Sequence, residues 1–252
     1  MRVAKFIALK SESDIPEGPG YLKLVKGGYD GIGTQRVDNR EQSIEVFRNF
    51  SSVGDVIFEE EIDCDKELSL VVAAGVHNTV FYPLVETIQE EGTCRYVIYP
   101  SGVDQSIEEK ARQMVGTVMD ELGTQGLFAF ELFLNKQGEL LMNESAPRPH
   151  NSGHITMDSM DCSQFETHMR AVAGLELNEP KPVKESAMMV NLLATKDGKF
   201  EPEKVFEHDS DTVTIHLYGK LMSRVKRKMG HINLWGENQW QRAQDLVKNV
   251  DI

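Results

Sequence analysis

The sequence GLFAFELFLNKQGELLMNESAPRPHNSGH, residues 126–154, holds two apolar runs separated by a polar turn. Residues 126–134 and 139–143 favour strands, and the glycine-containing turn between them is typical of a β-hairpin. Glu131 lies inside the first predicted strand, and Glu144 closes the second. An unpaired carboxylate is costly to bury. Two interpretations therefore stand: both glutamates face solvent at a sheet edge, or both are ligands of a hard cation such as Mg²⁺.

A stiff polar loop follows the predicted hairpin. Pro147 and Pro149 fix the backbone angle φ at their own positions and remove two hydrogen-bond donors. The same loop carries a dense set of anion-binding and proton-handling side chains: Arg148, His150, Asn151, Ser152 and His154. An ordinary surface loop seldom combines such groups on a constrained backbone, so the sequence indicates binding or catalysis here.

Segment 143–154, NESAPRPHNSGH, resembles the pattern NExAPRxHNSGH of the ATP-grasp ligases, and among them of the 5-(carboxyamino)imidazole ribonucleotide synthases. The resemblance implies an α+β ATP-grasp fold with a small C-terminal β domain. It also implies a carbon-nitrogen ligase of de novo purine biosynthesis that uses ATP and Mg²⁺. In that reaction ATP phosphorylates bicarbonate to carboxyphosphate, and the amine of 5-aminoimidazole ribonucleotide captures the carboxyl group. Glu131 and Glu144 would hold the metal, while Arg148 and His150 would stabilise carboxyphosphate or orient the amine. Asn151 and Ser152 would contact the substrate.

Composition narrows the alternatives. The chain has 252 residues and a formal charge of 27 − 40 = −13, which argues against a nucleic-acid surface but not against a nucleotide substrate. Three widely spaced cysteines indicate neither a disulfide framework nor a zinc site. The sequence shows no signal peptide and no long apolar run, which indicates the cytosol and no membrane partner.

A glycine-rich segment, residues 27–34, follows a predicted strand over residues 21–26. Its glycines let backbone N–H groups approach an anion closely, although a plain hairpin tip would also explain them. The segment resembles the family pattern LKxxxGGYDGKG, which implies a loop that closes over the ATP phosphates. Lys23 would then lie at the α-phosphate, and Ile32 departs from the Lys or Arg usual in the family. The other positions implied to contact ATP are Gly28, Gly31 and Gly33, and those implied to face the substrate and the bicarbonate-derived group are Tyr29 and Asp30.

The acidic run after the predicted strand 56–58 resembles the hinge of the ATP-grasp fold. By that resemblance Glu59 and the backbone of Ile62 would meet the adenine edge, and Glu67 would bind the ribose hydroxyls. The alternative for successive glutamates is a solvated sheet edge.

The C-terminal region carries a basic cluster in an acidic chain, from Arg224 to Lys228. Such a cluster beside His231 indicates a local anion site, although a solubilising turn has the same composition. The segment resembles the family pattern HxYGK…RKMGHI. The resemblance implies that Lys220 and Arg227 hold the ribonucleotide phosphate and that Lys228 lies near the ATP polyphosphate.

Periodicity predicts the remaining elements. Helices are expected over 39–50, 104–122, 158–172 and 237–250, and strands over 68–74, 77–84, 94–99, 187–193 and 212–218. Asn39 is the expected cap of the first helix, and Gly123 is the expected end of the second. The expected apolar stripe of the second helix consists of Ile107, Ala111, Met114, Val118 and Leu122. We expect three domains: a small ATP-grasp subdomain with the glycine-rich loop over residues 1–62, a large subdomain with the metal and substrate loop over 63–180, and a C-terminal β domain over 181–252.

The resemblance runs from about Tyr21 to about Trp235. Members of that family begin with a Rossmann-like domain of about 100 residues, a typical domain size. We therefore expect a fragment, part of a split enzyme or a divergent relative, which is incomplete as a ligase without such a domain. Its partners would be ATP, bicarbonate and 5-aminoimidazole ribonucleotide, with a homodimer or a separate N-terminal chain possible. Two alternatives stay open: an ATP-grasp ligase with a different acceptor, and a non-catalytic nucleotide-binding subunit.

Overall fold

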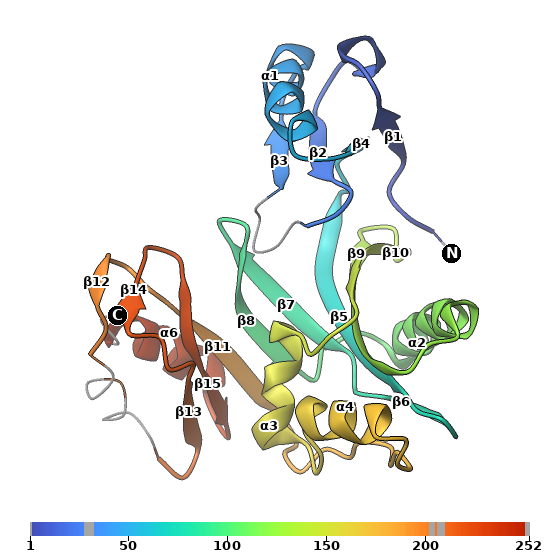
Figure 1. Ribbon diagram of the computed structural model, residues 1–252. Coiled ribbons are helices and arrows are strands. Elements are labelled where there is room, and N and C mark those ends of the chain that lie inside the picture. Colours follow the sequence, from blue (N-terminus) through green and yellow to red (C-terminus); the bar gives the residue numbers. More distant parts are fainter. Residues whose placement is uncertain (1, 28–32, 202–204, 206–209, 250–252) are drawn as a thin grey trace. The chain divides into compact units, whose positions relative to one another are not determined.

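The computed structural model describes residues 2–27, 33–201, 205 and 210–249 (Figure 1). The chain folds into two compact units. The first unit comprises Met1–Asp65, Glu91–Thr93 and Phe133–Asn143, and the second comprises Lys66–Glu90, Cys94–Leu132 and Glu144–Ile252. Within the described residues, no helix is long and apolar enough to cross a membrane.

The first unit contains a four-stranded antiparallel sheet in the order β1-β4-β2-β3. Its strands are β1 (Phe6–Leu9), β2 (Gly20–Leu24), β3 (Thr34–Val37) and β4 (Val56–Glu59), and a short 3-10 turn, η1 (Glu12–Asp14), follows β1. Helix α1 (Arg40–Ser51) begins after Asn39, whose side chain accepts a hydrogen bond from the Gln42 amide, as the sequence predicts. Apolar residues of the helix and the sheet, including Phe47, Leu22 and Phe58, form one buried cluster.

A nine-stranded sheet has the main order β10-β9-β5-β7-β8-β11-β15-β13, and β6 pairs with β5 outside this path. The strands are β5 (Cys64–Ala74), β6 (Thr79–Phe81), β7 (Val85–Glu90), β8 (Thr93–Tyr99), β9 (Gly126–Asn135), β10 (Leu140–Ala146), β11 (Ala187–Leu193), β13 (Val213–Leu217) and β15 (Lys228–Trp235). A separate two-stranded ribbon joins β12 (Gly198–Lys199) to β14 (Met222–Ser223). Because β11 pairs with β8, the C-terminal strands extend the sheet of the second unit.

The helices of the second unit are α2 (Gln105–Leu122), α3 (Thr156–Ser159), α4 (Gln164–Val172) and α6 (Gln239–Asn249), and a 3-10 turn, η2 (Asn151–Ile155), precedes α3. Helix α2 ends at Gly123 in the left-handed conformation (φ 56°), which confirms the predicted glycine stop.

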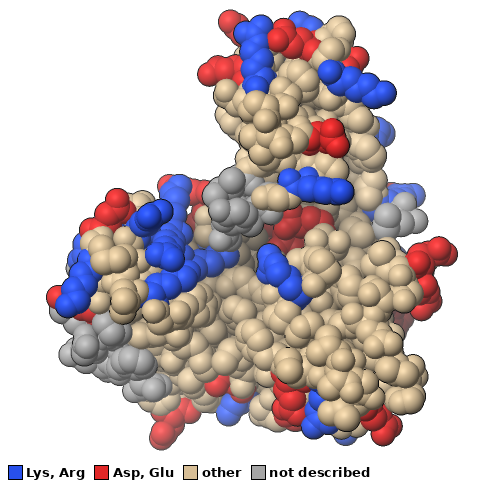
Figure 2. Space-filling model, viewed as in Figure 1, with Lys and Arg blue, Asp and Glu red and all other residues tan. Residues whose placement is uncertain are grey.

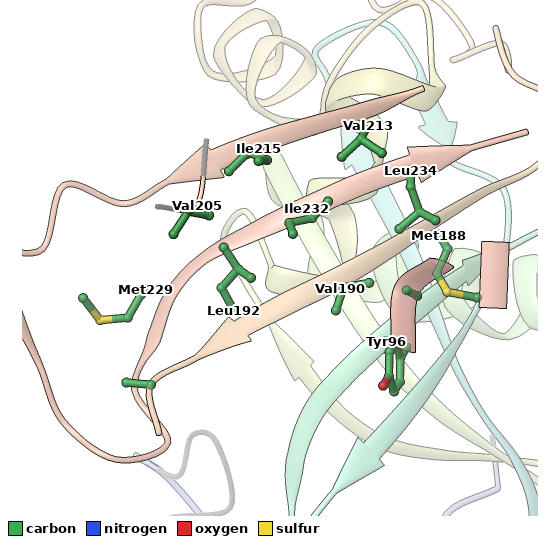
Figure 3. Packing of buried hydrophobic residues seen from close by; sticks show 12 residues of the cluster. Tyr96, Met188, Val190, Leu192, Val205, Val213, Ile215, Met229, Ile232 and Leu234 are labelled. Carbon is green, nitrogen blue, oxygen red and sulfur yellow. The ribbon is translucent and has the colours of Figure 1, made fainter. Parts of the chain in front are cut away.

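A buried apolar cluster holds the C-terminal strands together (Figure 3). Val190, Ile232 and Ile215 project from the adjacent strands β11, β15 and β13 into this cluster. Each strand buries apolar side chains in this cluster on one face. Because this packing holds the strands in place, it also fixes the positions of the polar residues on them.

Two predicted elements are wrong in part, and some strands were not predicted. The expected helix 158–172 is two short helices, because Met160 is extended and a new helix begins after Ser163, whose side chain accepts from the Glu166 amide. The expected strand 77–84 is only β6, and β7, which occupies the sheet beside β5, was not predicted. Strand β15 was also missed, because its basic start resembles a surface turn.

Candidate active site

The hairpin of β9 and β10 carries the two predicted metal ligands. The strands are neighbours in the sheet, and the Asn135 amide donates to the Glu139 carbonyl at 3.0 Å across the turn. Glu131 is half-buried in β9, and Glu144 is exposed in β10. Both belong to the second unit. Among the residues that the structure describes, no group of three or more His, Cys, Asp or Glu side chains is arranged to hold a metal ion.

His150 lies against the first of these glutamates. The distance from its Nε2 to the Glu131 Oε1 is 3.5 Å, and the two side chains are 15% and 23% exposed, so both are accessible to a small ligand. The loop predicted to follow the hairpin therefore brings one of its ionisable groups back to the strand that carries Glu131.

A buried glutamine fixes the backbone of this loop. Gln164, the first residue of α4, accepts a hydrogen bond from the His150 amide at 2.9 Å and donates to the His150 carbonyl at 2.8 Å. Its side-chain nitrogen also lies 2.7 Å from the His154 Nδ1. Gly153 permits this arrangement, since a Cβ there would lie 2.3 Å from the Gln164 Oε1. The start of α4 thus determines where both histidines lie.

The His150 ring contacts the hydroxyl group of Ser152, which in turn contacts the hydroxyl group of Ser69. Ser152 Oγ is 2.9 Å from His150 Nδ1 and 2.7 Å from Ser69 Oγ, and both serines are buried. Ser69 lies in β5 and Ser152 in η2, so the contact joins the loop to the sheet.

Asn151 is held by an amide pair. Its side chain exchanges two hydrogen bonds with the side chain of Asn191 in β11, at 2.8 and 2.7 Å. Asn191 is fully buried and also donates to the Cys94 carbonyl. Arg148, by contrast, is exposed, and its guanidinium donates to the Pro149 carbonyl at 3.1 Å.

A group of stacked imidazoles lies beyond the loop. His231 of β15 contacts the rings of His216 (centroid distance 4.7 Å) and His154 (5.1 Å), and its Nδ1 is 3.0 Å from the Tyr218 hydroxyl. The pKa of His154 is lowered to about 4 and that of His231 to about 2, mainly because the rings are buried and in part because other imidazoles lie close to them. These two rings are therefore neutral at pH 7.

The carboxylate of Asp158 contacts the ring of His216, at the end of the group of stacked imidazoles. Asp158 Oδ2 is 2.8 Å from His216 Nε2 and accepts a hydrogen bond from the Asn233 side chain at 2.6 Å. Burial raises the pKa of Asp158, but the hydrogen bonds from His216 and Asn233 outweigh it, so the net pKa lies below the ordinary value. The carboxylate is thus held ionised.

The basic residues of the C-terminal strands form a group on one face (Figure 2), over β12, β14 and β15. Lys220 is half-buried, donates to the Lys228 carbonyl and lies 5.4 Å from the centre of the Tyr218 ring. Arg227 is exposed and donates to the Met222 carbonyl at 2.9 Å. The structure therefore places Lys220 beside Lys228, on a segment that continues into the histidine stack.

In the first unit, two predicted ATP contacts lie together. Lys23 Nζ is 2.5 Å from Glu59 Oε2 and 2.9 Å from Asn143 Oδ1, and its side chain is 18% exposed. Ile62 is half-buried and lines a surface hollow with Pro19 and three acidic residues: Glu60, Glu61 and Asp63.

The glycine-rich connection joins two paired strands, as predicted, since β2 and β3 are antiparallel and the Leu24 amide donates to the Gly33 carbonyl at 2.8 Å. The other positions predicted there lie outside the described residues: Gly28, Tyr29, Asp30, Gly31 and Ile32. Glu67 is half-buried in β5 of the second unit, opposite Thr87 of β7.

Sequence reasoning missed four polar residues that hold the candidate site together: Ser69, Asp158, Gln164 and Asn233. Two carried a signal. Gln164 begins a helix directly after a serine cap, and Asp158 is the first residue of the expected helix 158–172, where an acidic residue is favoured. Ser69 and Asn233 lie inside apolar strands, where only the fold shows which polar group they meet.

The first 165 residues match the ATP-grasp domain family, and residues 187–245 match the phosphoribosylaminoimidazole carboxylase C-terminal domain family. N5-carboxyaminoimidazole ribonucleotide synthase of Bacillus subtilis (strain 168) is 36% identical over 255 residues, which cover 97% of this chain and 65% of that protein. The enzyme of the same name from Staphylococcus aureus (strain COL) is 34% identical, over 99% of this chain and 67% of that protein. The chain thus spans about two thirds of the length of these relatives.

Solved structures agree with this match. A crystal structure of N5-carboxyaminoimidazole synthase from Aspergillus clavatus, in complex with ADP and 5-aminoimidazole ribonucleotide, superposes with a TM-score of 0.86 at 25% identity. The superposition covers 98% of this chain and 69% of that one. The predicted α+β ATP-grasp fold is therefore confirmed. The chain belongs to the ATP-grasp family, as a relative of the N5-carboxyaminoimidazole ribonucleotide synthases.

Proposed function

We propose that this chain carries the site of an ATP-dependent ligase that carboxylates 5-aminoimidazole ribonucleotide with bicarbonate, a step of purine biosynthesis. The observation that carries the proposal is the contact between His150 and Glu131, at 3.5 Å, on a loop that also presents Arg148. A proton donor and an exposed guanidinium on one constrained loop, beside an oxygen ligand on β9, suit a reaction whose intermediates are anionic. The relatives' names and the ligands of the Aspergillus clavatus structure support the choice of substrates.

The chemistry assigns roles to the two groups of the loop. The γ-phosphoryl group of ATP passes to a bicarbonate oxygen, which releases ADP and forms carboxyphosphate. The amine nitrogen then attacks the carboxyl carbon, the bond from carbon to the bridging oxygen breaks, phosphate leaves, and the amine loses a proton. Arg148 and His150 would donate hydrogen bonds to the oxygens that carry the negative charge in both steps.

Glu131 and Glu144 fit a magnesium site. They are two carboxylates on the neighbouring strands β9 and β10, and no group of three or more His, Cys, Asp or Glu side chains among the described residues forms a complete metal cage. Mg²⁺ is typically bound by one or two carboxylates together with substrate phosphates. When bound, the cation would neutralise charge on the phosphates of ATP.

The remaining residues take the roles that the family resemblance gives them. In the first unit, the proposed ATP contacts are Lys23, Gly28, Gly31, Gly33, Glu59 and Ile62, and the proposed substrate and catalytic residues are Tyr29 and Asp30. In the second unit, the proposed ATP contacts are Glu67 and Lys228, and the proposed substrate contacts are Asn151, Lys220 and Arg227. The division into domains at residues 62 and 180 also stays a proposal.

The test measures ADP and carboxylated ribonucleotide separately, with MgATP alone, with bicarbonate, with 5-aminoimidazole ribonucleotide, and with both. The proposal predicts that both additions together are needed for product and that product and ADP form in equal amounts. The full-length Bacillus subtilis relative serves as the positive control, and the His150→Gln variant as the matched negative control. ADP formation that ignores the ribonucleotide would favour a ligase with a different acceptor. MgATP binding without turnover would favour a nucleotide-binding subunit.

A further inference from the structure

The contacts of the His150 ring assign its protons. The Ser152 amide N–H donates to Nδ1 at 3.4 Å, and an amide cannot reverse its role and accept. Nδ1 is therefore the unprotonated nitrogen, and the Ser152 hydroxyl, 2.9 Å away, donates to the same lone pair. In the neutral ring the proton is then on Nε2, which faces Glu131.

The number of protons on Ser152 also determines the direction of the hydrogen bond between Ser69 and Ser152. A serine hydroxyl has a single proton, and Ser152 uses its proton on His150. The 2.7 Å contact between the two serines must then be donated by Ser69. Ser69 and Ser152 are 0% and 2% exposed, so water does not compete for either hydroxyl. The chain of donors runs from Ser69 through Ser152 to His150.

We propose that Ser69 and Ser152 are positioning residues that hold His150 in the Nε2–H tautomer, so that its N–H points toward Glu131 and the reacting oxygens. The inference deepens the proposed function and rests on it. It also gives Ser152 a role different from the substrate contact that the family resemblance implies, because its hydroxyl is occupied inside the protein.

The arrangement has a chemical purpose at an anionic site. A neutral imidazole with its proton on Nε2 can donate to an oxyanion, whereas the other tautomer would present a lone pair and repel it. The Gln164 clamp holds the His150 backbone on both sides, so the serines need only set the ring's tautomer.

The direct test is the tautomer of His150, read from long-range ¹H–¹⁵N correlation spectra of protein labelled with ¹⁵N in its histidine rings. The His150→Gln variant identifies the signal. The wild type is expected to show the Nε2–H pattern. Ser152→Ala, and to a smaller extent Ser69→Ala, should shift the ring toward a mixture of tautomers. The matched control is Ser159→Ala, because Ser159 is equally buried but donates to the Ile155 carbonyl instead.

Kinetics supplies the second readout. Ser69→Ala and Ser152→Ala should lower kcat by about three- to tenfold, the effect of one ordinary hydrogen bond, with the KM for MgATP unchanged, whereas Ser159→Ala should leave kcat unchanged. A wild-type Nδ1–H tautomer would overturn the proposal, as would a spectrum or a kcat that ignores Ser152→Ala. A fixed Nε2–H tautomer in a protein that never forms product would refute the proposed function and still support the assignment of the protons.

Discussion

At the scale of single residues, the central assignment is the carboxylate pair of the β9–β10 hairpin. Replacing Glu131 or Glu144 with glutamine keeps the side-chain shape and removes a charged oxygen ligand. We expect Mg²⁺-dependent ATP binding to weaken by roughly tenfold or more, which corresponds to about 1.4 kcal/mol. Isothermal titration with and without Mg²⁺ measures this loss.

Glu139 provides the control for these variants. It lies at the turn of the same hairpin, where it forms an exposed ion pair with Arg2. Glu139→Gln should leave MgATP affinity unchanged. If the wild type and all three variants bind MgATP with equal affinity, Glu131 and Glu144 do not bind the metal.

Gly153 tests the glutamine clamp. A Cβ at this buried position would lie 2.3 Å from Gln164 Oε1 and 2.6 Å from its Cδ, so the clamp must move. We expect Gly153→Ala to lower the free energy of unfolding by about 1–3 kcal/mol, measured by urea denaturation. Gly116→Ala in α2 is the control, because its nearest contact would be 3.8 Å, and alanine favours a helix by up to about 1 kcal/mol. A Gly153→Ala protein as stable as the wild type would show that the clamp is loose.

The residue scale also shows how far sequence reasoning reaches. The sequence predicted Glu131 and His150 as separate candidates, and the fold brings them within 3.5 Å. It could not predict Ser69 or Asn233, because a buried polar side chain inside an apolar strand is identified only by the partner that satisfies it. The roles of all these residues stay predictions.

At the scale of elements, the stacked imidazoles of β13, β15 and the substrate loop predict a pH dependence of stability. The pKa of His231 falls from 6.5 to about 2 and that of His154 from 6.5 to about 4, both chiefly through burial. The unfolded chain therefore binds more protons below pH 6.5. The stability that these rings contribute is complete above pH 6.5 and falls as the pH drops, by about 1.4 kcal/mol per pH unit for each ring.

Removing one ring isolates this effect. Between pH 6 and pH 4.5, His231→Gln should reduce the dependence of the unfolding free energy on pH by about one proton. His77→Gln, at an exposed position, should leave it unchanged. Urea unfolding at several pH values measures the slope. If the slope is the same in His231→Gln and the wild type, His231 is not buried as a neutral ring.

The basic C-terminal segment carries a prediction about the ribonucleotide. Lys220→Gln and Arg227→Gln should each raise the KM for 5-aminoimidazole ribonucleotide about tenfold, since each removes one charged donor to a phosphate. The KM for ATP should change little. Arg224→Gln, an exposed neighbour in the same segment, is the control. If only the KM for ATP rises, Lys220 and Arg227 bind ATP and not the ribonucleotide.

Element boundaries show where periodicity misleads. In α2 the expected stripe contained Ala111, which is buried, and Leu122, which is 52% exposed, and it left out the buried residues Val115 and Met119. The prediction of the helix itself is confirmed, because α2 has the expected length and ends at the expected glycine. The break between α3 and α4 was missed, because a serine cap inside an apolar pattern does not interrupt the hydrophobic period.

At the scale of the whole molecule, the fold was predictable because a long motif specified it. The ATP-grasp fold follows from segment 143–154 and from the paired strands around the glycine-rich loop. The continuity of the sheet through β8, β11 and β15 did not follow, because pairing between strands far apart in sequence leaves no local signal.

The most direct test of the proposed reaction follows one oxygen atom. Bicarbonate labelled with ¹⁸O is supplied with MgATP and 5-aminoimidazole ribonucleotide, and the released phosphate is analysed by mass spectrometry. If ATP phosphorylates bicarbonate, the bridging oxygen of carboxyphosphate stays with phosphorus when the bond to carbon breaks. The proposal predicts one ¹⁸O in each phosphate released and one carboxylated ribonucleotide formed with it. Unlabelled phosphate would contradict it, because the phosphoryl group would then have passed to water or to another acceptor.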